Sequence, residues 1–276
     1  MMLFLDPVLT EAWRGRDPFA EAFALSGESF RAVKSRRTIR FELAGRGYFA
    51  KLHRGIGWRE FFKDLLQFKR PITDAGNEYR AIRQLEALGL DTMTCAGCGV
   101  RGWNPAARQS FLITEELTDV ISLEDLAKLS GERAVPYPQR CAIARQLAAT
   151  AGAMHRGGVN HRDCYLCHFL LKKSTVNAPV PTLYVIDLHR AQLRDRVPYR
   201  YLVKDVAGLW FSAMDAGLSR RDRLRFIREY ERRPLPEIFR ENRKFWRDVD
   251  RTARKLYRKE HGKEAPPLQV SSAPEI

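Results

Sequence analysis

The chain has 276 residues, of which 45% are hydrophobic and 29% are charged, so it can bury a sizeable core and is not a disordered protein. A formal net charge of +15 predicts attraction to nucleic acid, an anionic membrane surface, or phosphorylated and carboxylated substrates. Five cysteines argue against a closed disulfide framework and fit a reducing compartment. Because the start lacks the basic lead-in of a signal peptide and no window holds the ~18 apolar residues of a membrane span, we expect a cytoplasmic protein.

The first part of the chain is predicted to be rich in strands. Residues 29–52 contain three alternating segments separated by the turns "KSRR" and "AGRG". A helix that is both basic and aromatic is expected at 56–70, followed by the amphipathic helix "NEYRAIRQLEALGL" and the strands "TCAGCGVRG" and "SFLITEEL". These elements form an expected N-lobe at residues 1–117.

The second part of the chain is predicted to be mostly helical. Ser122 is a suitable N-cap for "SLEDLAKL", and "PQRCAIARQLAATAGAMHRGG" predicts a longer helix that stops at glycine. The strand "TLYVIDLH" precedes further helices up to "FWRDVDRTARKLYRK". We therefore expect a C-lobe at 118–262 and a disordered tail at 263–276. The predicted fold class is α+β, with two lobes and a ligand cleft between them.

Charged groups within the apolar stretch "GVNHRDCYLCHFLL" (158–171) indicate chemistry, because burying unpaired charges costs several kcal/mol or so. Phosphoryl transfer in a protein-kinase-like fold requires a lysine that holds the nucleotide phosphates and a glutamate that orients it. Lys51 and Glu78 have the right order and context for these roles. An aspartate that holds Mg²⁺ and one that accepts the proton of the attacking hydroxyl complete the set. Asp187 and Asp163 fit these two roles.

The sequence resembles the lipopolysaccharide core heptose(I) kinases, which are protein-kinase-like enzymes of Gram-negative bacteria. The matching segments are "GRGYFAKLHRGIGWREFFK" (45–63), "FLITEEL" (111–117), "GVNHRDCYLCHFLL" (158–171), "VIDLHRAQ" (185–192) and "FSAMDAGLSRRDRLRFIREY" (211–230). The resemblance implies a bilobal protein-kinase-like fold and an ATP-dependent kinase that phosphorylates the 4-hydroxyl of heptose I. It also implies that Asp163 is the catalytic aspartate, that Lys51 anchors the phosphates and that Asp187 binds Mg²⁺. "TEEL" (114–117), with Glu115 and Leu117, would be the hinge whose backbone meets the adenine.

Three departures from the general protein-kinase pattern bear on the site. His168 occupies the place of an asparagine that binds a second metal ion, and a neutral imidazole can ligate a divalent ion less well than oxygen does. "KSRR" replaces the glycine-rich loop, so Arg36 and Arg37 are expected to supply positive charge at the phosphates. Leu188 and His189 replace the Phe-Gly that follows the metal aspartate, so an activation-loop switch is not expected.

Other residues of the signature have structural interpretations. We expect His161 and Arg162 to brace the catalytic loop, and Asp205 to cap a helix or brace the same loop. The two C-x-x-C pairs are farther apart than in a zinc ribbon, and we expect buried free thiols. These pairs are formed by Cys95 and Cys98 and by Cys164 and Cys167.

The excess of basic residues suggests the partners. Lipopolysaccharide inner core is an anionic, lipid-linked sugar, so a basic surface that also contacts the inner membrane peripherally is expected. A set of arginines in "LSRRDRLRFIREYERR" is one candidate surface; it comprises Arg220, Arg221, Arg223, Arg225 and Arg228. The basic-aromatic helix at 56–70 is a candidate docking site for an acidic protein such as acyl carrier protein.

Alternative functions remain open from the sequence. A kinase of this type could act on a protein tyrosine or a small molecule such as an aminoglycoside. A degenerate kinase fold could also serve as a scaffold that binds an acidic partner. Nucleic acid is not expected as a partner, because we find no aromatic-basic recognition motif.

Overall fold

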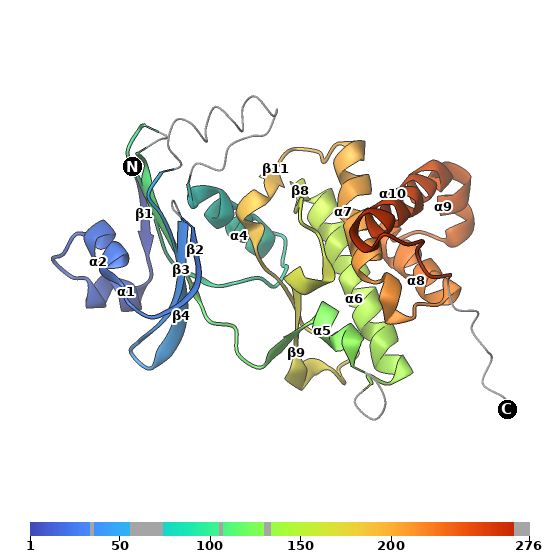
Figure 1. The fold of residues 1–276 in the computed structure, drawn as a ribbon, viewed down its shortest axis with the longest axis horizontal. Helices are drawn as coiled ribbons and strands as arrows, with labels where there is room; N and C mark the ends of the chain where they lie inside the picture. The colour runs from blue at the N-terminus through green and yellow to red at the C-terminus, as the bar shows by residue number, and fades with distance from the viewer. Residues whose placement is uncertain (34–35, 56–73, 105–106, 130–133, 268–276) are drawn as a thin grey trace. The chain divides into compact units, whose positions relative to one another are not determined.

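The computed structural model describes residues 1–33, 36–55, 74–104, 107–129 and 134–267 (Figure 1). The chain divides into two compact units. The first unit comprises Met1–Gln84, Met93–Leu117 and Asp187–Arg190. The second unit comprises Leu85–Thr92, Thr118–Ile186 and Ala191–Ile276. The helix expected at 56–70 and most of the tail, 268–276, lie outside the described residues.

The first unit is built on a six-stranded sheet with the order β1-β5-β6-β4-β3-β2, in which all neighbouring strands are antiparallel. Its strands are β1 (Met2–Leu5), β2 (Glu28–Val33), β3 (Arg36–Leu43), β4 (Arg46–His53), β5 (Cys95–Arg101) and β6 (Gln109–Glu115). The five expected strands are confirmed, whereas β1 was not expected. β3 begins at Arg36, so Arg36 and Arg37 lie in a strand and not in the turn to which the sequence assigned them.

Two short helices, α1 (Pro7–Ala12) and α2 (Pro18–Ala24), cover one face of this sheet, and the core of the unit lies between them and the strands. Leu9 and Phe19 are among the helix residues buried against the sheet. Neither helix was expected from the sequence. Their signal is an Asp-Pro pair at each start, because the aspartate caps the helix and proline fits its first turn.

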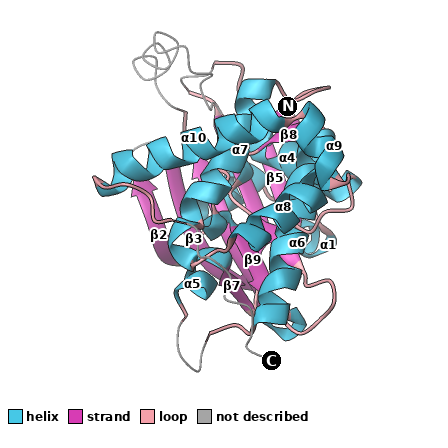
Figure 2. Cartoon of the chain, turned by 90° about the vertical axis from the view of Figure 1, so that its right-hand side faces the viewer, coloured by secondary structure: helices cyan, strands magenta, loops and turns pink. Residues whose placement is uncertain are grey.

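The second unit contains two small sheets and most of the helices (Figure 2). One sheet has the order β10-β9-β7, and the other pairs β11 with β8. Its strands are β7 (Val120–Ser122), β8 (Val159–Asn160), β9 (Phe169–Lys172), β10 (Leu183–Val185) and β11 (Gln192–Leu193). Its helices are α5 (Leu123–Lys128), α6 (Tyr137–Arg156), α7 (Tyr199–Ser212), α8 (Arg220–Glu231), α9 (Leu235–Glu241) and α10 (Arg243–His261).

Aromatic side chains hold the helices of the second unit together. α7 packs along α10, where the rings of Trp210 and Trp246 stack with centroids 5.6 Å apart. α6 packs against α8 at Gly152, where a Cβ would lie 2.6 Å from the carbonyl oxygen of Tyr230, so only glycine allows this approach. Ser122 caps α5 as predicted, since its hydroxyl accepts from the Asp125 N–H at 3.0 Å.

The remaining helix, α4 (Gly76–Ala87), starts in the first unit and ends in the second. It confirms the predicted amphipathic helix at this place. Among the helices in the described ranges, none is long and apolar enough to cross a bilayer.

Candidate active site

Lys51 and Glu78 form a nearly buried ion pair in the first unit. Strand alternation puts the neighbours of Lys51 on β4, Ala50 and Leu52, into the core, and Lys51 itself onto the opposite face of the sheet. Its Nζ donates to Glu78 Oε1 at 2.6 Å, and the Glu78 side chain is 2% exposed. Glu78 lies in the first turn of α4, where the helix dipole favours a negative charge. Each charge therefore offsets the cost of burying the other, and the lysine is held in one position.

Asp187 joins this pair from a distant part of the chain. Its Oδ1 lies 3.5 Å from Lys51 Nζ and accepts from His189 Nδ1 at 2.7 Å. The backbone at Asp187 is left-handed, with φ of 58°, and the chain then enters the 3₁₀ helix η4 (Leu188–Arg190). Asn77 on α4 donates to the His189 carbonyl at 3.0 Å, which fixes the turn. The side chain of Asp187 is 30% exposed, so a fixed carboxylate remains accessible to a ligand.

Arg36 lies on the same sheet face as Lys51. The register pairs Thr38 with Lys51 and Arg36 with His53, and cross-strand partners share a face. Burial, together with the charges of Arg36 and Lys51, lowers the pKa of His53 to about 4. The imidazole is therefore neutral at pH 7, and the positive charge here belongs to Arg36 and Lys51.

Arg37 is not brought to this face. Its register partner is Leu52, which points into the core on the other side of the sheet, and Arg37 itself is exposed. Because β3 begins at Arg36, both arginines belong to the strand, and strand alternation sends two consecutive residues to opposite faces of the sheet. The remaining cation of "KSRR", Lys34, lies outside the described residues.

The segment expected to form the hinge has a fixed backbone. The N–H of Glu115 donates to the Thr94 carbonyl and that of Glu116 to the Gly47 carbonyl, both at 2.9 Å. In the described part of the chain, the Leu117 N–H has no hydrogen-bond acceptor. The conformation of this segment therefore leaves a backbone donor where the resemblance places the adenine.

An ion pair that the sequence did not reveal holds this segment to the sheet. Arg40 Nε donates to both carboxylate oxygens of Glu116, at 2.9 and 3.0 Å. This hydrogen bond holds the pKa of Glu116 below its usual value, so the carboxylate stays charged. Glu116 also lies over Gly47, where any Cβ would overlap its carboxylate.

In the second unit, Asp205 braces the loop that carries Asp163. Asp205 lies on α7, its side chain is 1% exposed, and its Oδ2 and Oδ1 accept from the N–H groups of His161 and Arg162 at 2.7 and 3.0 Å. Arg162 has a left-handed backbone, with φ of 73°, which is unfavourable for an arginine unless the surroundings impose it. The two hydrogen bonds from Asp205 impose this turn and so position the following residue, Asp163. The predicted brace is thus observed.

The brace continues through two buried side chains that the sequence analysis did not identify. His155 on α6 contacts Asp205 Oδ2 through Nε2 at 3.3 Å and the Tyr230 hydroxyl through Nδ1 at 2.7 Å. Burial raises the pKa of Tyr230, so its hydroxyl keeps its proton. Since Asp205 only accepts, His155 Nε2 carries a proton, and Tyr230 on α8 can satisfy the other ring nitrogen. Helices α6, α7 and α8 are thereby connected to the loop.

His168 lies directly beneath this loop. Its Nδ1 donates to the Asp163 carbonyl at 2.7 Å, and its ring stacks on His161 with an angle of 6° between the planes. His161 Nε2 donates to the carbonyl of Ile186 at 2.9 Å, the residue that precedes Asp187. With Nδ1 used as a donor, Nε2 of His168 is the nitrogen that can offer a lone pair.

The donor atoms fit a magnesium ion held mainly by its nucleotide. The described ranges contain no group of three or more His, Cys, Asp and Glu side chains that could hold a metal. Mg²⁺ is usually bound through one or two carboxylates together with phosphate oxygens and water. The accessible, fixed carboxylate of Asp187 could serve as one such ligand.

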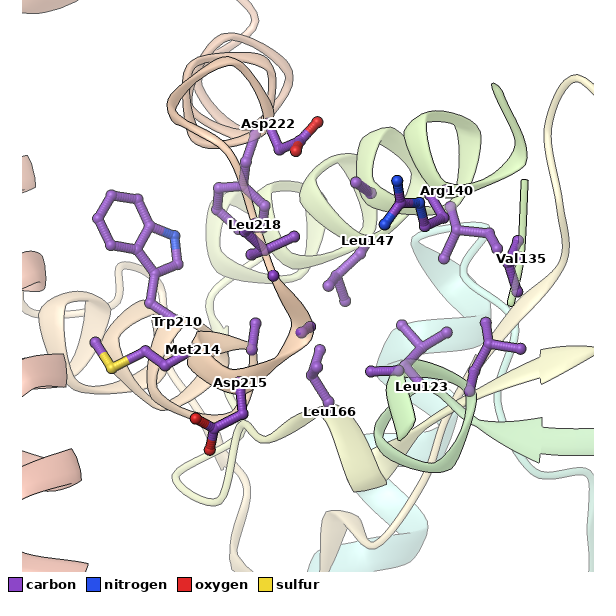
Figure 3. Close-up of a pocket in the computed structure, with 18 of the residues that line it drawn as sticks. Leu123, Val135, Arg140, Leu147, Leu166, Trp210, Met214, Asp215, Leu218 and Asp222 are labelled. Atoms are coloured by element: carbon purple, nitrogen blue, oxygen red, sulfur yellow. The ribbon is translucent and has the colours of Figure 1, made fainter. Parts of the chain in front are cut away.

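A separate apolar cavity of about 400 Å³ lies within the second unit (Figure 3). Its lining comes mainly from α5, α6, α7 and α8, and includes Leu123, Leu147, Trp210 and Leu218. Leu166, three residues after Asp163, also contributes. This cavity was not expected from the sequence, because its lining residues are far apart in the chain and come together only in the folded unit.

The five cysteines are free. Cys95 and Cys98 are buried on β5, and Cys164 is buried beside Asp163, where burial raises the pKa of its thiol.

Comparison with known proteins identifies the family. Residues 20–230 match the lipopolysaccharide kinase (Kdo/WaaP) family. "Lipopolysaccharide core heptose(I) kinase WaaP" of Pseudomonas aeruginosa is 49% identical over 258 residues, which cover 93% of this chain and 96% of the relative. The protein of the same name from Escherichia coli is 42% identical over 256 residues, which cover 92% of this chain and 97% of the relative.

A solved structure, "WaaP in complex with acyl carrier protein", is similar with a TM-score of 0.79 and 45% identity, and the match covers 93% of this chain and 100% of that chain. This similarity includes both the sheet-rich unit and the helical unit, so the predicted protein-kinase-like α+β fold is confirmed. The chain belongs to the lipopolysaccharide kinase (Kdo/WaaP) family.

Proposed function

We propose that this protein transfers the γ-phosphoryl group of ATP to the 4-hydroxyl of heptose I in the lipopolysaccharide inner core, at the cytoplasmic face of the inner membrane. The main support is its identity of 42–49%, over most of its length, to relatives named lipopolysaccharide core heptose(I) kinase. The contact of Lys51 with both Glu78 and Asp187 supports catalysis over a degenerate scaffold, because this cluster has the composition of a nucleotide-phosphate site.

In this proposal the first unit holds the nucleotide. Lys51, oriented by Glu78, aligns the phosphates, and Arg36 on the same sheet face adds a second positive charge. Asp187 holds Mg²⁺, which when bound neutralises charge on the phosphates. The backbone of Glu115 and Leu117 meets the adenine, with the Leu117 N–H as donor.

The second unit supplies the group that acts on the acceptor. Asp163 accepts the proton of the attacking hydroxyl, and Asp205 holds the backbone that positions it. His168, which donates to the Asp163 carbonyl, is a candidate second ligand for a metal ion through Nε2.

A transfer assay tests this function. The purified protein is incubated with γ-labelled ATP and dephosphorylated core oligosaccharide, and the product is located by mass spectrometry and NMR. We expect label on the 4-hydroxyl of heptose I, and none on a tyrosine peptide or an aminoglycoside.

A saturating nucleotide, at about 100 times Kd, should stabilise the protein by ~2.7 kcal/mol. This shift should disappear in Asp187→Ala.

Two results would contradict the proposal. Label on the peptide or aminoglycoside in place of the sugar would show a different acceptor. The absence of both transfer and a nucleotide-dependent shift would favour the scaffold alternative.

We also propose that an acyl carrier protein is a partner and that its acyl chain occupies the apolar cavity of the second unit. The similar solved structure is of WaaP bound to acyl carrier protein, and a cavity of about 400 Å³ is of the size that a chain of this kind fills. The net charge of +15 favours an acidic partner.

Leu218→Arg, which places a charge in the cavity lining, tests the partner proposal. We expect the affinity for acylated carrier protein to fall at least about tenfold, because the longer arginine side chain would occupy part of the space that the acyl chain needs and would bring a charge against that chain. Calorimetric titration with acylated and unacylated carrier protein measures this. Equal affinity of the unmodified chain for the two forms would contradict occupation of the cavity.

A further inference from the structure

Helix α10 presents a row of cations to solvent. Its buried side, which includes Phe245, Trp246 and Val249, packs against the rest of the second unit. The opposite side carries basic residues spaced three or four apart, which places them along one face. We call this set the cationic face of α10; it comprises Lys244, Arg247, Arg251, Lys255 and Lys259, all exposed. In Figure 1 this helix is drawn in dark red beside α9.

The charge of this face is largely uncompensated. One carboxylate, Asp248, lies among these cations, 2.9 Å from Lys244 Nζ and 3.6 Å from Arg251, and it also accepts from the Tyr199 hydroxyl. Within the described ranges, the other three cations of the face, Arg247, Lys255 and Lys259, have no acidic partner. The face therefore retains most of its positive charge.

The arginines of α8, which the sequence suggested as the basic surface, differ in this respect. Arg223 pairs with Asp250 at 2.6 Å, and Arg225 with Asp222 at 2.9 Å. Arg228 contacts Glu229 at 2.9 Å. Three of the five candidate arginines are thus engaged within the protein, so α8 is the weaker candidate for an anionic partner.

Stabilisation of the helix itself does not explain the cationic face. Cations near a helix C-terminus interact favourably with the helix dipole, but this effect is confined to the last turn. The helix dipole therefore accounts for Lys259, which lies in the last turn of α10. Arg247 and Lys255 lie farther from the C-terminal end of the helix at His261.

The start of α7 extends the positive surface. Tyr199, its first residue, bonds Asp248 on α10, and the Lys244 ammonium lies 4.9 Å from the centre of the Tyr199 ring. Arg200 and Lys204 follow on α7, and both are exposed. Neither forms an ion pair with any described residue.

We propose that the cationic face of α10, together with Arg200 and Lys204, binds the anionic headgroups of the bilayer that carries the acceptor. The choice of a membrane acceptor rests on the proposed function. The surface suits a bilayer because its charges are spread along a helix about 28 Å long, as expected for 19 residues, and are not gathered around a pocket. No residue of α10 lines the apolar cavity, so an acyl carrier protein seated there would use other side chains.

The buried position of the apolar side of α10 determines the type of binding. Because Phe245, Trp246 and Val249 are committed to the core, the helix cannot insert an apolar face into lipid as a free amphipathic helix does. Binding is therefore electrostatic, requires anionic lipid and weakens as salt screens the charges.

Co-sedimentation with vesicles tests this inference on the full chain. The vesicles are phosphatidylcholine with or without phosphatidylglycerol. The test variant is Arg247→Glu/Lys255→Glu/Lys259→Glu, and the matched control, Arg220→Glu/Arg221→Glu/Arg228→Glu, makes the same charge change on α8. Each basic residue near an anionic surface contributes roughly fivefold to binding, so we expect the test variant to lose about a hundredfold or more in affinity for the anionic vesicles. We expect the control to stay within about twofold.

The outcomes separate the inference from the proposed function. Both variants should remain folded, with a cooperative thermal transition, and should retain the parent's transfer to soluble core oligosaccharide. Loss of vesicle binding by the α10 variant supports the inference even if the protein phosphorylates another acceptor. Equal binding by both variants, or equal loss, would overturn it. A fall in affinity for acyl carrier protein without a change in vesicle binding would also overturn it and would identify a protein-docking face.

Discussion

Replacement of Asp163 by asparagine is expected to lower kcat for transfer to core oligosaccharide by about 10²–10⁴-fold, the usual loss for a missing general base. The amide has the shape of the carboxylate but cannot accept the hydroxyl proton. The loop geometry should persist, because the backbone N–H groups of His161 and Arg162 bond to Asp205 and the substitution leaves both bonds in place. Steady-state kinetics and nucleotide-dependent thermal shift measure the two effects, and we expect nucleotide binding to be unchanged.

Asp195→Asn is a suitable control, since Asp195 is an exposed aspartate of the same unit with no role in the proposed site. It should have full activity. A normal rate in Asp163→Asn would show that another group removes the proton.

Asp205→Asn is expected to reduce both stability and activity, although Asp205 contacts neither substrate in the proposal. Its two oxygens accept from His161, Arg162 and His155, so an amide would turn an N–H toward a donor and leave buried groups unpaired. The free energy of unfolding should fall by about 3 kcal/mol. Because the left-handed turn at Arg162 depends on these bonds, kcat should fall while the KM for ATP changes little. Urea unfolding and steady-state kinetics measure these changes.

Tyr230→Phe provides a graded comparison at the far end of the same network. It keeps the ring and removes only the hydroxyl that contacts His155, so the free energy of unfolding should fall by about 1 kcal/mol.

If Asp205→Asn unfolded at the same urea concentration as the parent and kept its kcat, the loop would not depend on this brace.

The secondary structure could be predicted wherever a local pattern specified it. Strand alternation in residues 29–52 and the serine cap before α5 are local, and both were confirmed. Strand boundaries are less local, because pairing with a neighbour can extend a strand. β3 accordingly begins at Arg36, and this shift of two residues decides that Arg36 and Arg37 lie on opposite faces.

The sequence also predicted a set of charged residues for the candidate site. Lys51, Asp163 and Asp187 lie in segments that match the family, whereas Glu78 was chosen by its order in the chain and its place in a predicted helix. The sequence could not identify residues that act through others. Arg40 and Glu116 are 76 residues apart, and His155 and Tyr230 are 75 apart, and each pair is formed only by the folded chain. No spacing rule relates such residues, since their contact depends on how separate elements pack.

By itself the sequence determined the α+β class, the family resemblance and the set of ionisable residues expected to act on ATP. These follow from local periodicity and from motifs contained within single segments. The tertiary structure decided which cations share the face of Lys51, how Asp205 holds the loop that carries Asp163, and which basic helix keeps its charge. The reason is physical: Arg223 on α8 is neutralised by Asp250 on α10, 27 residues away, and only packing brings such a carboxylate within reach.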